Sequence, residues 1–244
     1  MKNLILVNLL LALAYSGFAQ TGRIIAPSTH AWYMENGTIK LNEKWLLFHD
    51  VQFRRADLLP EDQQLLLRAG IGYNLSSSIQ IMAGYCFVQT YPYGDFPVRN
   101  QFPENRLWQQ LILKAPIGRT TFINRYRLEQ RYLGNSTTGS LANPRFENRV
   151  RYLGRVNIPL QKGDEYKLYG FIYDEIFINF GKNVGVNIYD QNRIAAGLGW
   201  KLDKKLSIEL GYMNQMVQQR ALQSNGKSVL ENNHTLIASL VSNF

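Results

Sequence analysis

Cysteine is almost absent from this chain: Cys86 is the only one among 244 residues. A single thiol cannot form an intrachain disulfide bond, and it excludes metal sites built from several cysteines. Histidine is scarce too, with three residues. Beyond the N-terminus, no apolar run approaches the roughly 18 residues that a transmembrane helix needs. The chain therefore lacks the patterns of a disulfide scaffold, a thiolate cluster and a helical membrane protein.

The first 19 residues have the pattern of a secretory signal peptide. Lys2 supplies the positive start, Leu4 to Tyr15 is apolar apart from Asn8, and Ala19 ends a small-residue cleavage site. We therefore expect export, cleavage of the signal peptide and a location in the outer membrane of a Gram-negative bacterium.

The chain is basic, with a formal net charge of +9. An exported chain rarely meets nucleic acid, so this charge favours a cationic lumen or contact with anionic lipopolysaccharide.

Apolar and polar residues alternate through the rest of the chain with the period of a β-strand. Most of the ten segments with this pattern have 11 to 15 residues. Strands of soluble proteins have roughly 5 or 6 residues, whereas a tilted strand needs roughly 9 to 11 to cross a bilayer. The segments are 43–55, 63–74, 79–91, 104–116, 119–132, 145–158, 165–179, 190–202, 205–220 and 231–244.

The links between these segments alternate in length: 76–78 and 116–118 are short, and 56–62, 92–103 and 133–144 are longer. Short periplasmic turns and longer extracellular loops are typical of bacterial barrels. The sequence therefore predicts an all-β fold, an antiparallel transmembrane β-barrel of about 10 strands (10–12). The predicted count of ten is even, as expected for a single-chain bacterial barrel.

The predicted domains are the signal peptide 1–19, an N-terminal segment 20–42 and the barrel 43–244. The N-terminal segment is too short for an extra pair of crossings, which would need about 20 residues. Within it, Asn36 and Gly37 are typical of a hairpin turn. We interpret this segment as a partial strand or a plug.

Charged side chains identify the face of each strand that points inward. In 125–132, arginine and glutamate share one phase, while Tyr126, Leu128 and Tyr132 share the other, and 145–158 repeats the pattern. An arginine facing lipid at the bilayer midplane costs roughly 2–4 kcal/mol, so the charged phase must line the lumen. The predicted lumen charge ladder consists of Arg125, Arg127, Glu129, Arg131, Arg145, Glu147, Arg149, Arg151 and Arg155.

The ladder also predicts a register. Opposing Arg131 to Glu147 and Glu129 to Arg149 brings opposite charges together, whereas a slip of two pairs sets Glu129 against Glu147, which is repulsive. Functionally, the ladder has two interpretations. It fills a narrow barrel with interlocked ion pairs, or it forms an anion-selective constriction or a site for an acidic ligand. The excess of arginine over glutamate keeps the second interpretation open.

Enzyme and metal sites find little support in the sequence. His234 shares the lipid-facing phase of its strand, and His30 lies in the N-terminal segment. His49 shares a phase with apolar residues, which implies either a histidine facing lipid or a bulge. No nucleophilic serine motif accompanies any of the three, and the acidic residues of the first loop lack the spacing of a calcium site. We expect no catalytic residue, no metal and no cofactor.

Several segments carry a family resemblance. They are Arg125–Arg131, Asn148–Tyr152 and Tyr173–Phe177, together with Trp32, Lys44-Trp45 and Arg54-Arg55. They resemble the domain-of-unknown-function 2490 family of exported bacterial proteins, over nearly the whole mature chain. The resemblance implies an outer-membrane barrel and brings no activity or catalytic residue with it.

The sequence thus predicts a non-enzymatic outer-membrane barrel with an Arg-rich lumen, acting as a narrow channel, a ligand-binding barrel or a surface-interaction barrel. Its expected partners are membrane lipid, lipopolysaccharide and a small anionic solute. The alternative is a barrel enzyme that acts on lipid or lipopolysaccharide. Whether the lumen is open or plugged, and the oligomeric state, are left open at this point.

Overall fold

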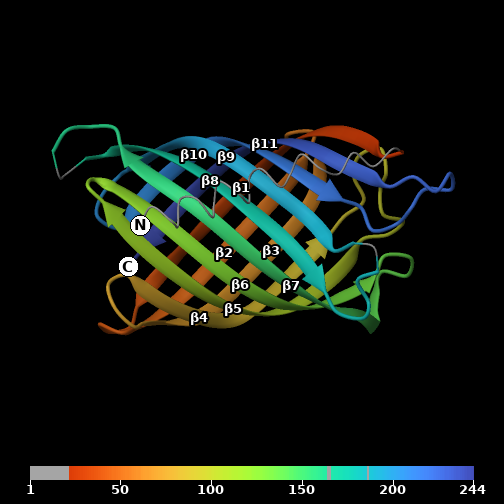
Figure 1. Ribbon diagram of the computed structural model, residues 1–244, viewed down its shortest axis with the longest axis horizontal. Coiled ribbons are helices and arrows are strands. Elements are labelled where there is room, and N and C mark those ends of the chain that lie inside the picture. The colour runs from red at the N-terminus through yellow and green to blue at the C-terminus, as the bar shows by residue number, and fades with distance from the viewer. Residues whose placement is uncertain (1–21, 164–165, 186) are drawn as a thin grey trace.

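Eleven strands, joined in chain order, close into one barrel in the computed structural model, which describes residues 22–163, 166–185 and 187–244 (Figure 1). The predicted signal peptide lies outside the described residues. No helix in the described part of the chain has the length and apolarity to cross a membrane. The strands are β1 (Ile24–Lys40), β2 (Trp45–Ala56), β3 (Glu61–Asn74), β4 (Ile79–Thr90), β5 (Phe102–Ile117), β6 (Thr120–Asn135), β7 (Ser140–Pro159), β8 (Leu168–Phe180), β9 (Tyr189–Lys201), β10 (Leu206–Gln218) and β11 (Val229–Asn243).

The predicted all-β barrel is confirmed, and its ten predicted strands correspond to β2–β11. Two of the predicted long loops, 56–62 and 133–144, are instead four-residue links, 57–60 and 136–139. In the first, Asp57 and Leu58 both have positive φ and make a tight turn. At the second, β6 and β7 continue to pair as far as Asn135 and Ser140.

The eleventh strand is β1, which corrects the interpretation of residues 20–42 as a partial strand or plug. β1 has 17 residues and pairs antiparallel with β2 and parallel with β11. Gly37 lies inside the strand rather than in a turn. A Cβ at this position would overlap the carbonyl oxygen of Ser242 on β11. The glycine that suggested a hairpin therefore permits the close approach of two strands.

Because the number of strands is odd, the first and last strands run in the same direction. The barrel is therefore antiparallel everywhere except at the β1–β11 pair. The even strand count predicted from the sequence is therefore corrected. Ile24 pairs with Val229 at one end of the barrel, and Thr38 pairs with Asn243 at the other. We call the first the loop end, with links 57–60, 91–101, 136–139 and 219–228, and the second the turn end, with links 41–44, 75–78, 118–119 and 202–205. In Figure 1 the loop end is on the right and the turn end on the left.

The outer surface of the barrel is apolar, as the strand phases predicted. Leu67, Ile71, Leu198 and Leu210 are 42–59% exposed on it. At the turn end, the rings of Trp45 and Tyr73 meet at 4.9 Å, where an aromatic girdle is expected.

Polar groups on the outer surface are hydrogen-bonded to one another, as groups facing hydrocarbon must be. Gln109 on β5 and Gln130 on β6 exchange two hydrogen bonds of 3.1 Å. The Tyr152 hydroxyl donates to Asn124 at 2.7 Å. An apolar outer belt with paired polar side chains is typical of transmembrane β-barrels.

Two apolar clusters divide the inside of the barrel. One lies on β8–β11 and β1 and includes Trp32, Tyr169, Phe171 and Met213. The other lies on β2–β5 and includes Leu46, Leu66, Met82 and Trp108. Arginines of β6 and β7 contact both clusters: Arg127 lies 5.2 Å from the ring centre of Trp108, and Arg155 lies 4.5 Å from that of Phe171.

Candidate functional site: an arginine-rich lumen

The structure brings the nine residues of the lumen charge ladder together on β6 and β7. Arg131 opposes Glu147 and Glu129 opposes Arg149, which confirms the predicted register. Arg127, Glu129 and Arg149 are 1–3% exposed, whereas their neighbours Tyr126 and Val150 are on the outer surface. Arg125, Arg145 and Arg155 are half-buried members of the same face. The alternation of side chains along each strand produces this arrangement.

Toward the loop end, the charged side chains form a compact network of ion pairs. Glu104 on β5 accepts hydrogen bonds from both Arg106 and Arg131, with closest distances of 2.6 Å to each. Arg149 bridges Glu129 and Asp190, at 2.5 and 2.6 Å. Every arginine named here has a carboxylate partner, as buried charges require. We call this set of six residues the loop-side network.

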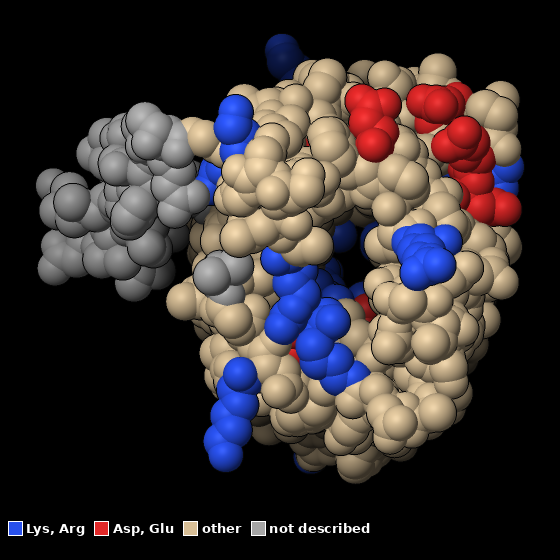
Figure 2. Space-filling model, turned by 90° about the vertical axis from the view of Figure 1, so that its right-hand side faces the viewer, with Lys and Arg blue, Asp and Glu red and all other residues tan. Residues whose placement is uncertain are grey.

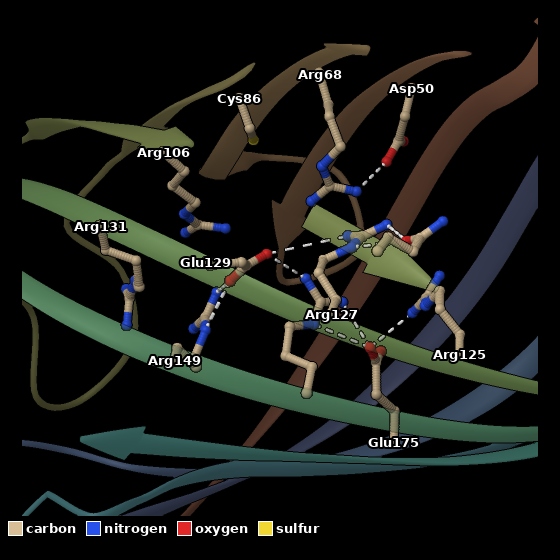
Figure 3. A network of polar contacts seen from close by, with 12 residues as sticks. Asp50, Arg68, Cys86, Arg106, Arg125, Arg127, Glu129, Arg131, Arg149 and Glu175 are labelled. Atoms are coloured by element: carbon tan, nitrogen blue, oxygen red, sulfur yellow. Dashed lines mark hydrogen bonds and ion pairs between the residues drawn. The ribbon is translucent and has the colours of Figure 1, made fainter. Parts of the chain in front are cut away.

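Toward the turn end, the lumen widens into a cavity of about 480 Å³. Thr38, Asn157, Lys201 and Asn243 line its mouth, and Arg127 lines its inner part. We call this cavity the vestibule. Arg68, Arg125 and Arg127 line its floor, and Figure 3 shows these three side chains with Glu129 and Glu175 beside them.

The vestibule carries a large excess of positive charge. Eight cationic side chains and three acidic ones line it, which gives a formal net charge of +5. The acids are Asp50, Glu175 and Glu209, and the cations are Arg54, Arg68, Arg125, Arg127, Arg151, Arg155, Arg193 and Lys201.

Three arginines of the vestibule are held mainly by neutral groups. The Arg127 guanidinium donates two hydrogen bonds to Gln110 Oε1, and its nearest acidic oxygen, on Glu129, is 4.0 Å away. Arg54 donates to the amide oxygens of Gln52 and Gln64 and stacks on Trp32 at 3.8 Å.

Arg193, the third, donates to Gln191 at 3.2 Å, and its nearest acidic oxygen, on Glu175, is 3.8 Å away. Amides satisfy hydrogen-bonding capacity but add no negative charge, so the carboxylates nearest to Arg127 and Arg193 compensate their charge only from 3.8 Å or more.

The remaining hydrogen-bonding capacity on the vestibule floor points the same way. Among the described residues, Arg127 Nη1, Arg68 Nε and Arg125 Nε have no hydrogen-bond partner, while the outer nitrogens of Arg68 and Arg125 pair with Asp50 and Glu175 at 2.6 Å. Arg127 also experiences the like charges of Arg68, Arg125 and Arg151. Positive groups gathered in this way favour a bound or passing anion.

The loop end has its own opening, which Figure 2 shows at the centre of that face with basic side chains at its rim and inside it. The 91–101 loop covers part of the lumen here. The Tyr93 hydroxyl donates to Glu231 at 2.9 Å, and its ring packs edge-on against His30. Burial and the adjacent Glu231 carboxylate raise the pKa of Tyr93. His30, whose place was ambiguous in the sequence, is therefore a buried residue inside the barrel.

His49 faces the outer surface, so the histidine predicted to face lipid or mark a bulge does face outward. Its Nε2 lies 2.9 Å from Glu35 Oε1 and 3.1 Å from Ser242 Oγ, and Ser242 donates to the same carboxylate oxygen at 2.7 Å. In a catalytic triad the acid binds the other ring nitrogen and leaves Nε2 free to accept the serine proton. Here the serine proton goes to Glu35, which suits a structural clasp. His234 is also on the outer surface, bonded to Tyr212.

Sequence reasoning left several residues out of the predicted site. Glu104, Arg106 and Asp190 belong to the loop-side network, and Arg54 to the vestibule. Glu104 and Arg106 alternate in the same way as the ladder, so that signal was present. Nothing local distinguishes Arg54, because its role comes from the amides that two strands bring to it. No group of metal-ligating side chains occurs in the described residues.

Comparisons with known proteins give a family for this chain but no activity. The model of the family described as protein of unknown function (DUF2490) matches residues 29–225. An uncharacterized protein of Methylorubrum extorquens is 25% identical over 182 residues, which cover 71% of this chain and 72% of that protein. A solved structure, the NanC porin in a rhombohedral crystal form, is 10% identical, with a TM-score of 0.46, and the likeness covers 83% of this chain and 93% of that one. The barrel assignment itself rests on the strand pairing.

Proposed function

Because this chain belongs to the DUF2490 family of proteins of unknown function, we propose a role from its lumen: it is a non-enzymatic outer-membrane barrel that forms a narrow passage for small anions. The observation that carries this proposal is the vestibule, where eight cationic side chains face three acidic ones. In a lumen with low-dielectric walls, such an excess attracts anions and repels cations.

The two ends of the lumen support a passage rather than a solid plug. The vestibule lies at the turn end, and an opening lies at the loop end. Between them, the loop-side network narrows the path with interlocked ion pairs. Arg149 and Arg151 both donate to Glu129 there. Only small solutes are expected to pass such a constriction.

The proposed location is the outer membrane, with the turn end toward the periplasm. The N-terminal signal-peptide pattern, the apolar outer belt and the aromatic pair at the turn end support it. Membrane lipid then covers the outer belt, and lipopolysaccharide would contact the outer leaflet side of the barrel.

The test is conductance across a planar bilayer in a potassium chloride gradient. We expect a small conductance and a reversal potential that is displaced from zero toward the equilibrium potential of chloride. Arg127→Gln and Arg151→Gln each remove a positive charge from the lumen, so the reversal potential should shift toward the equilibrium potential of potassium. Arg55→Gln is the matched control, because Arg55 pairs with Asp62 in the loop-end hairpin and does not line the vestibule. Absence of conductance, or equal selectivity in all variants, would contradict the proposal.

The alternative function, a barrel enzyme acting on lipid or lipopolysaccharide, would draw on the Glu35–His49–Ser242 group on the lipid-facing surface, although the Ser242 proton is directed at Glu35 rather than at His49. Ester hydrolysis by the purified barrel, lost in both His49→Ala and Ser242→Ala, would establish it. Activity that survived replacement of all three histidines by alanine would remove every histidine-based form of this alternative.

A further inference from the structure

The vestibule is larger than an inorganic anion requires. Its volume of about 480 Å³ lies within the range of roughly 300–1,000 Å³ typical of small-molecule sites. A water molecule, similar in size to a chloride ion, takes up only roughly 30 Å³ of liquid volume. Size alone therefore favours an organic solute.

Apolar side chains line the vestibule on two sides. Phe48, Met82 and Ile112 come from β2, β4 and β5 and belong to or pack on one apolar cluster. Met34 and Ile237 come from β1 and β11 and belong to or pack on the other. A lumen that conducted only hydrated ions would have no need of such walls, whereas small-molecule sites are lined mainly by apolar groups.

Arg127 connects the charged floor to the first apolar wall. Gln110, which holds the Arg127 guanidinium, also donates to Met82 Sδ at 3.3 Å. The Arg127 guanidinium lies 5.2 Å from the ring centre of Trp108, which meets the Phe48 ring at 5.6 Å. A ligand with its anionic group on Arg127 Nη1 would thus have its body beside Phe48 and Met82.

We infer that the vestibule is a binding site for an organic anion, with the anionic group at Arg127 and Arg68 and an apolar body against Phe48, Met82 and Ile112. This inference rests on the same lumen as the proposed passage, and it adds the chemical class of the solute. A planar carboxylate on an aromatic or aliphatic body has both required parts.

The experiment is isothermal titration calorimetry on the full-length barrel in detergent, with three probes at equal ionic strength. Benzoate has the charge and the apolar body, acetate has the charge alone, and benzamide has the body alone. We expect benzoate to bind at least about tenfold more tightly than either of the others, since both contacts are needed.

Two variants locate the site. Arg127→Gln should weaken benzoate binding about tenfold or more, and Ile112→Gln should bring the affinity for benzoate down to that for acetate. Arg55→Gln should bind benzoate as the parent protein does. The unheated and heated mobilities in SDS gels show that each variant is folded. If Arg127→Gln does not fold, Arg127→Lys takes its place and should bind benzoate more weakly than the parent protein.

The inference is overturned if benzoate binds no better than acetate, or if binding is the same in Arg127→Gln and Ile112→Gln as in the parent protein. Its outcome is separate from that of the proposed function. Selective benzoate binding without conductance would leave an anion-binding barrel and remove the passage. Anion-selective conductance without selective benzoate binding would keep the passage and remove the organic ligand.

Discussion

At the scale of the residue, the arginines of the lumen fall into two groups according to their hydrogen-bond partners. Arg106, Arg131 and Arg149 are bonded to carboxylates, whereas Arg54 and Arg127 are bonded to amides. A buried ion pair recovers much of the cost of removing both charges from water, but an amide partner recovers less. The first kind of arginine holds the barrel together, and the second is kept at an energetic cost, which the proposed anion would offset.

Glu129 provides a test of the structural kind. It is 1% exposed and accepts hydrogen bonds from Arg149 and Arg151. Glu129→Gln removes one of the two carboxylate partners of each guanidinium group and leaves Arg149 with Asp190 and Arg151 with Glu175. We therefore expect a loss of about 3 kcal/mol in the free energy of unfolding, the lower end for a broken buried ion pair. Guanidinium chloride titration of the barrel in detergent, followed by tryptophan fluorescence, measures this.

Glu61→Gln is the matched control, because Glu61 is exposed at the loop-end start of β3. It should unfold at the same denaturant concentration as the parent protein. Pairing the first change with Arg151→Gln should recover part of the loss, since it removes one buried positive charge while Glu175, the other partner of Arg151, keeps its ion pair with Arg125. An unchanged midpoint for Glu129→Gln would show that the loop-side network does not stabilise the fold.

At the scale of the element, the parallel β1–β11 pair is the unusual part of the barrel. It joins the two ends of the described sheet, and its strands approach closely where Gly37 opposes Ser242. Across the same place, the clasp of Glu35, His49 and Ser242 links β1, β2 and β11. The clasp and the glycine together seal the closure on its lipid-facing side.

Gly37→Ala tests this closure. Its Cβ would overlap the Ser242 carbonyl oxygen, so the strands must separate locally, and we expect a loss of about 1–3 kcal/mol. Gly154→Ala on β7 is the control, because the nearest atom to its Cβ would be the Tyr152 hydroxyl oxygen at 3.5 Å. The temperature at which the folded band disappears from SDS gels should fall for the first variant only. Equal temperatures for the two variants would mean that the closure tolerates the wider spacing.

Most strands could be predicted from the sequence, because the alternation of polar and apolar residues within each strand shows which face points inward. Charges that cannot face lipid fixed the inward face of β6 and β7, and their signs fixed the register. The identity of β1 was not accessible in this way, because Asn36 and Gly37 have the same local preference in a hairpin and in a close strand contact. The vestibule was equally hidden, since Arg54, Arg127 and Arg193 come from three strands and acquire their neutral partners only when the barrel closes.

At the scale of the whole molecule, the lumen is asymmetric along the barrel axis. Its loop-side network pairs charges closely, while its turn-end vestibule is basic and wide. Anions arriving from the turn end would meet the attractive region first and the constriction second. The positive potential of the vestibule would raise the local concentration of anions at the entrance to the constriction.

The odd strand count makes a prediction about the ends that an even count would reverse. Because β1 and β11 are parallel, Gly22 must lie on the same side of the membrane as Asp95 in the 91–101 loop, opposite Lys204 in the 202–205 turn. All three are exposed, and Cys86, the only cysteine, is buried. Gly22→Cys, Asp95→Cys and Lys204→Cys in a Cys86→Ser background therefore report sidedness with a membrane-impermeant maleimide. On intact cells we expect the first two to be labelled, and Lys204→Cys only after the outer membrane is permeabilised. If Gly22→Cys were instead labelled together with Lys204→Cys, β1 would not cross the membrane in parallel with β11, and the vestibule wall that Trp32 and Met34 form would have to come from elsewhere.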